Sequence, residues 1–237
     1  MDENAKSLVT RTYNERLAAF GPSLRSLGWP KGRQEIRFRV VREVGIAEGD
    51  AVLDVGCGLG DLARYFDLIG LTVRYFGCDL NVRMLEEARK RNPALELHLR
   101  AIDEDPYPEN TFDWVVSTGL FELLSHENEE AQWAWIDHML EVMLRTARKG
   151  VAIDFLSSLV DYRAPANFHA DPAAVLALAS RHTRRFALRH DYMPFEFYAY
   201  LYKDQNRSER NVYSAVEVGP DDEIRGALSA NGAGGAR

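Results

Sequence analysis

Residues 52–62, VLDVGCGLGDL, join an apolar run to a glycine-rich loop in this chain of 237 residues. The apolar run carries one carboxylate, Asp54, and three glycines then alternate with other residues before a helical pattern begins. Glycine adopts backbone conformations that other residues avoid, and it lets the chain approach a bound molecule closely. The stretch therefore predicts a strand, a ligand-binding loop and a helix in direct succession.

Beyond this loop, β-rich apolar runs alternate with segments of helical periodicity. The runs expected to form parallel strands are 51–56, 71–79, 95–102, 112–119 and 151–158. The segments expected to form helices are 60–70, 81–91, 131–150 and 171–183. This alternation predicts an α/β fold in which helices cover both faces of a doubly wound, mostly parallel sheet.

The end of the chain breaks this pattern. Two aromatic-rich runs, 185–192 and 195–203, are separated by only two residues, which predicts an antiparallel hairpin. We therefore expect a seven-stranded sheet that ends on a hairpin strand running against the others. The small, polar and glycine-rich tail, 219–237, is predicted to be disordered.

Two helices are expected before the first strand. Apolar residues recur at helical spacing from Ala5 to Phe20 and again from Ile36 to Val44. An α/β core does not need these helices. We therefore divide the chain into an N-terminal helical cap, 1–45, and a core, 46–205.

Composition excludes several classes of protein. The chain is 46% hydrophobic and 27% charged with a net charge of −7, which is typical of a globular protein without a basic surface for nucleic acid. Its two cysteines, Cys57 and Cys78, are too few for a disulfide framework. Neither has a Cys or His partner at ligand spacing, so no metal site is predicted.

The N-terminal residues lack the basic and then apolar order of a secretory signal. No uncharged apolar run in the sequence is long enough to cross a bilayer. We therefore expect a cytoplasmic monomer or homodimer that binds neither membrane nor nucleic acid.

Two phosphate-binding interpretations of the glycine loop can be tested on the sequence. A Walker-type loop needs Gly-Lys followed by Ser or Thr, which is absent here. A dinucleotide loop needs G-x-G-x-x-G or a final Ala, and Gly58, Gly60 and Ala63 meet that pattern, with Asp79 as the acid after the second strand. An NAD(P)-binding oxidoreductase therefore stays an open alternative.

The same loop resembles the first motif of the class I S-adenosylmethionine-dependent methyltransferases, an acid, one residue and then G-x-G-x-G. The segment GCDLN, 77–81, resembles their second motif, and 105–124 resembles the segment that runs from the adenine pocket into strand four. The resemblance extends over 45–202. It implies a Rossmann-like methyltransferase fold whose sheet ends on an antiparallel hairpin strand, and S-adenosylmethionine as the cofactor.

The resemblance also implies roles for particular residues. Asp79 would hold both ribose hydroxyls, and Asp54 would stay ionised near the cationic amino end of the cofactor. Many family members carry an acid for the adenine amino group where Ala101 stands here, so Asp103 or Glu104 is expected instead. The cofactor-binding residues expected on this basis are Asp54, Gly56, Cys57, Gly58, Gly60, Asp79, Leu80, Ile102, Asp103 and Thr118.

The acceptor is expected beyond the carboxyl ends of the strands, where open α/β sheets bind ligands. Glu122, His190 and Tyr192 fall near that rim and are the candidate bases, should the acceptor have to lose a proton. A residue without a chemical task on a hairpin strand is the alternative for His190. No metal-assisted step is expected.

Three residues of the N-terminal helices are candidates for closing the pocket: Tyr13, Trp29 and Arg37. Simple packing is the alternative for Tyr13, and Arg37 is expected to meet either the cofactor carboxylate or a surface acid.

The sequence STGL, 117–120, stands where methyltransferases of exocyclic base or glutamine nitrogens carry Asn or Asp followed by Pro-Pro. We therefore predict an S-adenosylmethionine-dependent enzyme that methylates a small molecule by in-line transfer. The alternatives are an NAD(P)-binding oxidoreductase and a cofactor-binding module without catalysis.

Overall fold

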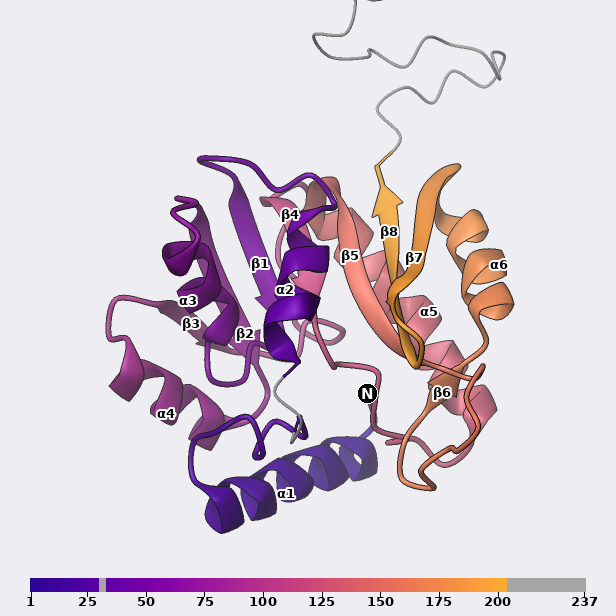
Figure 1. The fold of residues 1–237 in the computed structure, drawn as a ribbon, viewed down its shortest axis with the longest axis horizontal. Coiled ribbons are helices and arrows are strands. Elements are labelled where there is room, and N and C mark those ends of the chain that lie inside the picture. The colour runs from indigo at the N-terminus through magenta and orange to yellow at the C-terminus, as the bar shows by residue number, and fades with distance from the viewer. Residues whose placement is uncertain (30–32, 204–237) are drawn as a thin grey trace, which may run out of the picture. The chain divides into compact units, whose positions relative to one another are not determined.

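A computed structural model describes residues 1–29 and 33–203. They form one β-sheet with helices packed on both of its faces (Figure 1). The tail 219–237, predicted to be disordered, lies outside the described residues. The strands are β1 (Ala51–Val55), β2 (Arg74–Asp79), β3 (Glu96–Leu99), β4 (Phe112–Ser117), β5 (Ala147–Ser157), β6 (His169–Ala170), β7 (Arg185–Met193) and β8 (Glu196–Tyr202). The helices are α1 (Glu3–Phe20), α2 (Gln34–Arg42), α3 (Asp61–Leu68), α4 (Val82–Arg91), α5 (Glu129–Thr146) and α6 (Pro172–His182).

The sheet has the strand order β3-β2-β1-β4-β5-β8-β7, and β6 pairs with β5 off this path. All pairs from β3 to β5 are parallel. Strand β8 runs antiparallel to both β5 and β7. The predicted fold class is therefore confirmed, and the two-residue strand β6 is an addition that the sequence does not indicate.

Apolar side chains fill a separate layer on each face of the sheet. Helices α5 and α6 contribute Ile136, Leu140 and Val175 to the layer on one face. Helices α2 and α3 contribute Val41 and Phe66 to the layer on the other face. Strand β1 lies between these layers with all five residues buried, which explains its continuous apolar sequence.

The boundary between α5 and β5 differs from the prediction. The helix expected over 131–150 ends at Thr146, and Ala147 already pairs with Phe112 of β4. Arg148 and Lys149 then form ion pairs with acids near the amino ends of neighbouring strands, Asp113 and Asp50. These charged residues look like an exposed helix face in the sequence. The prediction was wrong because cross-strand partners satisfy them in the sheet.

The two N-terminal helices have different surroundings. Helix α2 belongs to the apolar layer that it shares with α3, since Phe38, Val40 and Val41 are buried there. Helix α1 lies across the end of the sheet at which the parallel strands finish (Figure 1). Helix α1 and the turn after it therefore cover the strand ends, and the start of α2 adjoins the same region through Gln34 and Phe38. The division into a cap, 1–45, and a core, 46–205, stays a prediction.

Candidate active site

The glycine loop after β1 is fastened to the end of the neighbouring strand β2. The backbone N–H groups of Gly56 and Cys57 both donate to the carbonyl of Cys78, over 2.8 and 3.1 Å. Gly58 has a left-handed backbone with φ +52°, and a Cβ there would stand 2.9 Å from Cδ2 of Leu27. Glycine is therefore required at Gly58 by both its conformation and its surroundings.

Asp54 lies at the end of β1 and is 5% exposed. Burial raises the pKa of this carboxyl to about 7, and the charges of Asp79 and Asp61 add to the effect, while a hydrogen bond from Tyr75 opposes it. The sequence-based expectation that Asp54 stays ionised is thus incomplete. In the protein alone, this carboxyl changes its charge near neutral pH.

Asp79 ends β2 and holds the glycine loop. Its Oδ2 accepts a hydrogen bond of 2.9 Å from Gly58 N, and its Oδ1 accepts one of 2.8 Å from Asn81 N. Burial raises the pKa of Asp79, although these backbone hydrogen bonds oppose the shift. Asp79 therefore has a structural role in the loop in addition to its expected contact with ribose.

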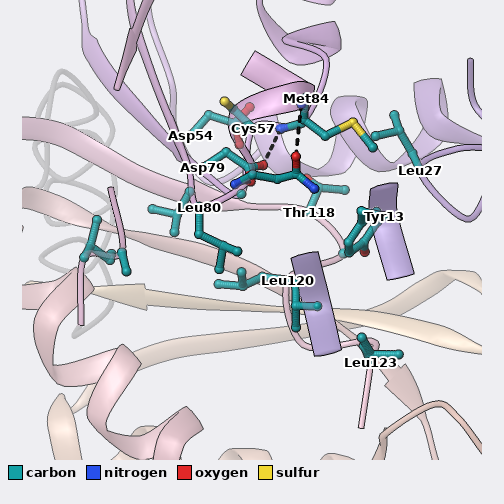
Figure 2. A pocket seen from close by; sticks show the side chains of 18 of the residues that line it. Tyr13, Leu27, Asp54, Cys57, Asp79, Leu80, Met84, Thr118, Leu120 and Leu123 are labelled. Carbon is teal, nitrogen blue, oxygen red and sulfur yellow. Dashed lines mark hydrogen bonds between the residues drawn. The ribbon is translucent and has the colours of Figure 1, made fainter. Parts of the chain in front are cut away.

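Both carboxyls line a pocket of about 1130 Å³, its solvent-open part included, beyond the ends of the parallel strands. Figure 2 shows that the side chain of Tyr13, from α1, reaches the same pocket as Asp79 and Leu80, which follow β2. Of the predicted cofactor residues, the following line it: Asp54, Gly56, Cys57, Gly58, Asp79, Leu80, Ile102, Asp103 and Thr118. Gly60 does not line the pocket and instead forms the N-cap of α3.

The charges around the pocket are mostly negative. The acidic residues in its lining are Asp54, Asp61, Asp79 and Asp103, and Arg100 is the basic side chain among the described lining residues. Arg100 is itself 3.1 Å from a carboxylate oxygen of Asp105. The pocket therefore suits a cationic ligand better than a phosphate.

Asp103, one of the two expected adenine-binding acids, lies at the far end of this pocket. Its Oδ2 accepts hydrogen bonds from the indole N–H of Trp135, over 3.1 Å, and from the amino group of Met1. Burial favours a raised pKa, but the contacts with Met1 and Trp135 prevail, and the pKa of Asp103 is lowered. The other expected acid, Glu104, is not among the pocket-lining residues.

Two of the three residues predicted to close the pocket line it, namely Tyr13 and Trp29. Burial raises the pKa of Tyr13 to about 12, so its hydroxyl stays protonated at neutral pH. Arg37 does not line the pocket. It forms an ion pair with Glu196 of β8, a fully buried residue, and so meets neither the cofactor site nor a surface acid.

None of the three predicted bases is among the residues that line the pocket. His190 lies on the outer hairpin strand β7, where its Nε2 is 3.3 Å from the carbonyl of Pro194. The hydroxyl of Tyr192 donates to Oε1 of Glu196 over 3.2 Å, and burial raises the pKa of Tyr192 well above its usual value. Glu122 lies in the sequence between Leu120 and Leu123, which both line the pocket. Of the three candidate bases, it is therefore the one whose chain segment forms part of the pocket wall.

Glu122 belongs to a largely buried group of charges. Its Oε1 is 3.5 Å from Nη2 of Arg37, and its side chain is 17% exposed. Burial raises the pKa of Glu122, and the charge of Arg37 opposes the shift. A carboxyl held in this way can exchange a proton in a range closer to neutral than an exposed glutamate does.

Sequence reasoning missed several contributors to the pocket. Asn81 caps α4 by accepting from Arg83 N and Met84 N, and it also lines the pocket, although it was not among the expected cofactor residues. Leu120 and Leu123 come from the segment after β4, where the sequence has no periodic pattern that reveals their direction. The position of Asn81 two residues after Asp79 was the available signal.

Within residues 1–29 and 33–203, no group of three or more His, Cys, Asp or Glu side chains is arranged to hold a metal ion. In the same part of the chain, none of the helices combines the length and the apolar character needed to span a bilayer.

Residues 52–143 match the family model described as a methyltransferase domain. The protein named "Putative methyltransferase" from Mycobacterium tuberculosis is 28% identical over 169 residues, which cover 66% of this chain and 95% of that protein. A "Probable fatty acid methyltransferase" from Pseudomonas putida is 38% identical over 101 residues, which cover 40% of this chain and 25% of that protein.

Among solved structures, magnesium protoporphyrin IX methyltransferase from Synechocystis with bound S-adenosylmethionine has a TM-score of 0.60 and 15% identity. The likeness covers 86% of this chain and 99% of that one. A methyltransferase from Aquifex aeolicus has a TM-score of 0.55 and 21% identity, covering 73% and 93%. These structures share the fold of the described sheet. Residues 52–143 thus match a methyltransferase domain, and the described sheet has the fold of S-adenosylmethionine-dependent methyltransferases.

Proposed function

We propose that the pocket binds S-adenosylmethionine and that the enzyme transfers the methyl group to a small organic acceptor. The observation that carries this proposal is the charge of the pocket, whose lining has four aspartates against Arg100 and the amino group of Met1. S-adenosylmethionine has a sulfonium and an amino group but no phosphate. A dinucleotide would bring a pyrophosphate to the glycine loop that Asp54 adjoins, and like charges placed close together are unfavourable.

The residues of the pocket fit this cofactor on chemical grounds. Asp54 and Asp79 both have raised pKa values, as expected of buried carboxyls that lack a cationic partner. We propose Asp54 for the amino group and Asp79 for the ribose hydroxyls. Leu80 and Ile102 supply apolar contact area for the adenine ring, and Asp103 accepts from its amino group.

The remaining assignments concern the loop. Gly56 and Gly58 allow the backbone to approach the cofactor, Cys57 and Thr118 contact it from the pocket wall, and Gly60 shapes the turn into α3. Thr118 is fixed by a hydrogen bond of 3.0 Å to the hydroxyl of Tyr198.

The bound cofactor supplies a methyl group that its sulfonium already activates. The protein's task is therefore to hold the acceptor in line with that methyl group and to exclude water. Tyr13 and Trp29 face the pocket from the N-terminal segment, and we propose that α1 and the turn after it act as the cap. Glu122 is the proposed proton acceptor, because His190 and Tyr192 lie away from the pocket wall.

The acceptor is proposed to be a small molecule with a substantial apolar part. Apolar side chains around the outer pocket include Val9, Leu27, Phe38, Leu120 and Leu123. Similar proteins include methyltransferases named for fatty acid, demethylmenaquinone and magnesium protoporphyrin IX, which is in line with a small-molecule acceptor. A cytoplasmic location and a monomeric or homodimeric state stay predictions.

Calorimetric titration tests the cofactor. Adenosylmethionine and adenosylhomocysteine are expected to bind with micromolar affinity, and NADH and NADPH are expected not to bind. Tight NADH binding without adenosylmethionine binding would overturn the proposal in favour of an oxidoreductase. Adenosylhomocysteine release with a panel of small acceptors then separates an enzyme from a module that binds the cofactor without turnover.

A further inference from the structure

Three carboxyl groups meet one guanidinium group behind the pocket wall. Glu122 follows β4, Asp154 lies on β5, and Glu196 begins β8; Arg37 of α2 contacts two of them. Nε of Arg37 donates to Oε1 of Glu196 over 2.6 Å, and a second hydrogen bond joins the same two side chains. Glu196 therefore neutralises most of the positive charge of the Arg37 guanidinium.

Glu122 is the second carboxyl close to the Arg37 guanidinium, and it also lies near another cation. Its Oε1 is 3.5 Å from Nη2 of Arg37, and Arg16 of α1 is the second cation that favours its ionised form. This Oε1 atom has no hydrogen-bond partner within the described residues. Glu122 thus pairs with nearby cations, while its Oε1 can still accept a hydrogen bond.

Asp154 has even fewer partners. It is 1% exposed, and its Oδ1 accepts a hydrogen bond of 2.7 Å from the backbone N–H of Gly119. Its Oδ2 is buried and has no hydrogen-bond partner among the described residues. Burial and the charges of Glu196 and Glu122 hold the pKa of Asp154 well above its usual range. A buried carboxyl in this state gains from any ligand that brings positive charge and a hydrogen-bond donor.

The group lies directly against the pocket. Gly119, which donates to Asp154, and Thr118 both line the pocket, as do Leu120 and Leu123 on either side of Glu122. A Cβ on Gly119 would stand 3.0 Å from the ring of Trp29, so Trp29 closes over this part of the wall.

Tyr13 lies near both the buried carboxyls Glu122 and Asp154 and the proposed cofactor residue Asp79. The carboxyls of Glu122, Asp79 and Asp154 all contribute to the raised pKa of Tyr13, after burial. Tyr13, which lines the pocket, therefore lies within electrostatic range of Asp79 and of both Glu122 and Asp154.

We propose that Asp154 and Glu122 bind a protonated amine of the methyl acceptor. An ammonium group has donors for Oδ2 of Asp154 and Oε1 of Glu122, and its positive charge adds to that of Arg37, which does not offset burial and the like charges at Asp154. An anionic acceptor is disfavoured, because Glu196 already neutralises Arg37. The inference rests on the proposed function and adds to it the class of acceptor.

Isosteric probes test the charge of the acceptor. The full-length protein, saturated with adenosylhomocysteine, is titrated calorimetrically with 2-phenylethylamine, 2-phenylethanol and 3-phenylpropanoate. The amine is expected to bind about tenfold or more tightly than the alcohol, the usual gain for hydrogen bonds to a charged group, and the carboxylate more weakly still. Equal or tighter binding of the alcohol or the carboxylate, or no binding of the amine, overturns the proposal.

The variant Asp154→Asn tests the residue. It keeps an oxygen for Gly119 N but removes the charge, so amine affinity is expected to fall about tenfold while adenosylhomocysteine affinity is unchanged. Glu43→Gln is the matched control, since Glu43 is an exposed acid paired with Arg189 on the outer hairpin strand. A loss of adenosylhomocysteine affinity without a loss of amine affinity would assign Asp154 to the cofactor instead and overturn the proposal.

Two outcomes separate this proposal from the proposed function. Failure of the wild-type protein to bind adenosylhomocysteine contradicts the function itself. Normal adenosylhomocysteine binding without preference for the amine contradicts only the acceptor class. If Asp154→Asn melts well below the wild type, Glu122→Gln replaces it, with the same fall in amine affinity expected and an unchanged affinity overturning the proposal.

Discussion

Tyr75 on β2 donates a hydrogen bond of 2.7 Å from its hydroxyl to Oδ2 of Asp54 on β1. The two strands pair in parallel, so the contact crosses directly from one strand to its neighbour. It is the interaction that opposes burial and like charge at Asp54, whose pKa nevertheless rises to about 7. The site proposed for the cationic amino end of the cofactor thus contains a carboxyl that titrates near neutral pH.

Cofactor binding is therefore expected to depend on pH. An ammonium group favours the ionised form of Asp54, so the affinity for adenosylhomocysteine should rise as the pH increases through about 7, the pKa of this group in the protein alone. Binding below this pH should release protons. Calorimetry in two buffers of different ionisation enthalpy measures both effects. An affinity that is constant across this range would contradict the assignment of Asp54 to the amino group.

Tyr75→Phe is expected to move this pH dependence. The substitution removes the hydrogen bond that lowers the pKa of Asp54, so the midpoint of affinity against pH should shift upward. At high pH, where Asp54 is ionised in both proteins, the affinities should converge. The control is Tyr162→Phe, because Tyr162 is 74% exposed. A uniform loss of affinity at every pH would indicate a distorted pocket instead.

Asp54 is also expected to make the stability of the unliganded protein depend on pH. Its pKa is about 7 in the folded protein against an ordinary value of 3.8 for an exposed aspartate, so the folded state binds more protons between these values. The unfolding free energy should therefore fall as the pH rises across this window, by an upper bound of about 4 kcal/mol. Denaturant titrations of the wild type and Asp54→Asn isolate the contribution, because other acids are common to both. Parallel curves for the two proteins would contradict the raised pKa.

Much of the fold followed from local patterns in the sequence. The alternating strands and helices and the tightly joined hairpin predicted the sheet and its reversed strand because each depends on neighbouring residues. The end of α5 was missed, since Arg148 and Lys149 find their partners on strands that are distant in the sequence.

In the candidate site, too, residues in local motifs could be predicted and contacts between distant residues could not. Asp54, Gly58 and Asp79 belong to short motifs and were found, and they line the pocket together. The proton-transfer residues were expected from the position of the hairpin, but the side-chain direction on β7 turns His190 toward Pro194 and Phe197. Arg37 and Glu196 are 159 residues apart, and no local sequence pattern predicts an ion pair between such distant residues.

Gly58→Ala is expected to weaken cofactor binding more than it weakens the fold. The left-handed backbone at Gly58 costs a side chain about 1–2 kcal/mol, and the added Cβ displaces Leu27 into the pocket. Gly70→Ala is a matched control, because Gly70 has φ +69° with no atom within 4 Å of the added Cβ. Both variants should lose similar stability in thermal melts. Calorimetry should find the loss of adenosylhomocysteine affinity in Gly58→Ala alone, and equal affinities would contradict the role of this glycine.

The ion pair between Arg37 and Glu196 is expected to be important for stability because both side chains are buried. Glu196→Gln leaves Arg37 with only Glu122 at 3.5 Å, and the unfolding free energy should fall by about 3 kcal/mol, the lower end for breaking a buried pair.

The pair of Glu43 and Arg189 is the natural control for this loss. It also joins the α2 region to the hairpin, but its side chains are 41% and 31% exposed. Glu43→Gln should therefore cost only about 0–1 kcal/mol. Replacing both Arg37 and Glu196 by methionine should recover much of the lost stability, because apolar side chains of similar size carry no desolvation penalty. Denaturant titrations of these variants give the comparison. Equal losses for Glu196→Gln and Glu43→Gln would show that the buried position of the first pair adds nothing to its effect on folding.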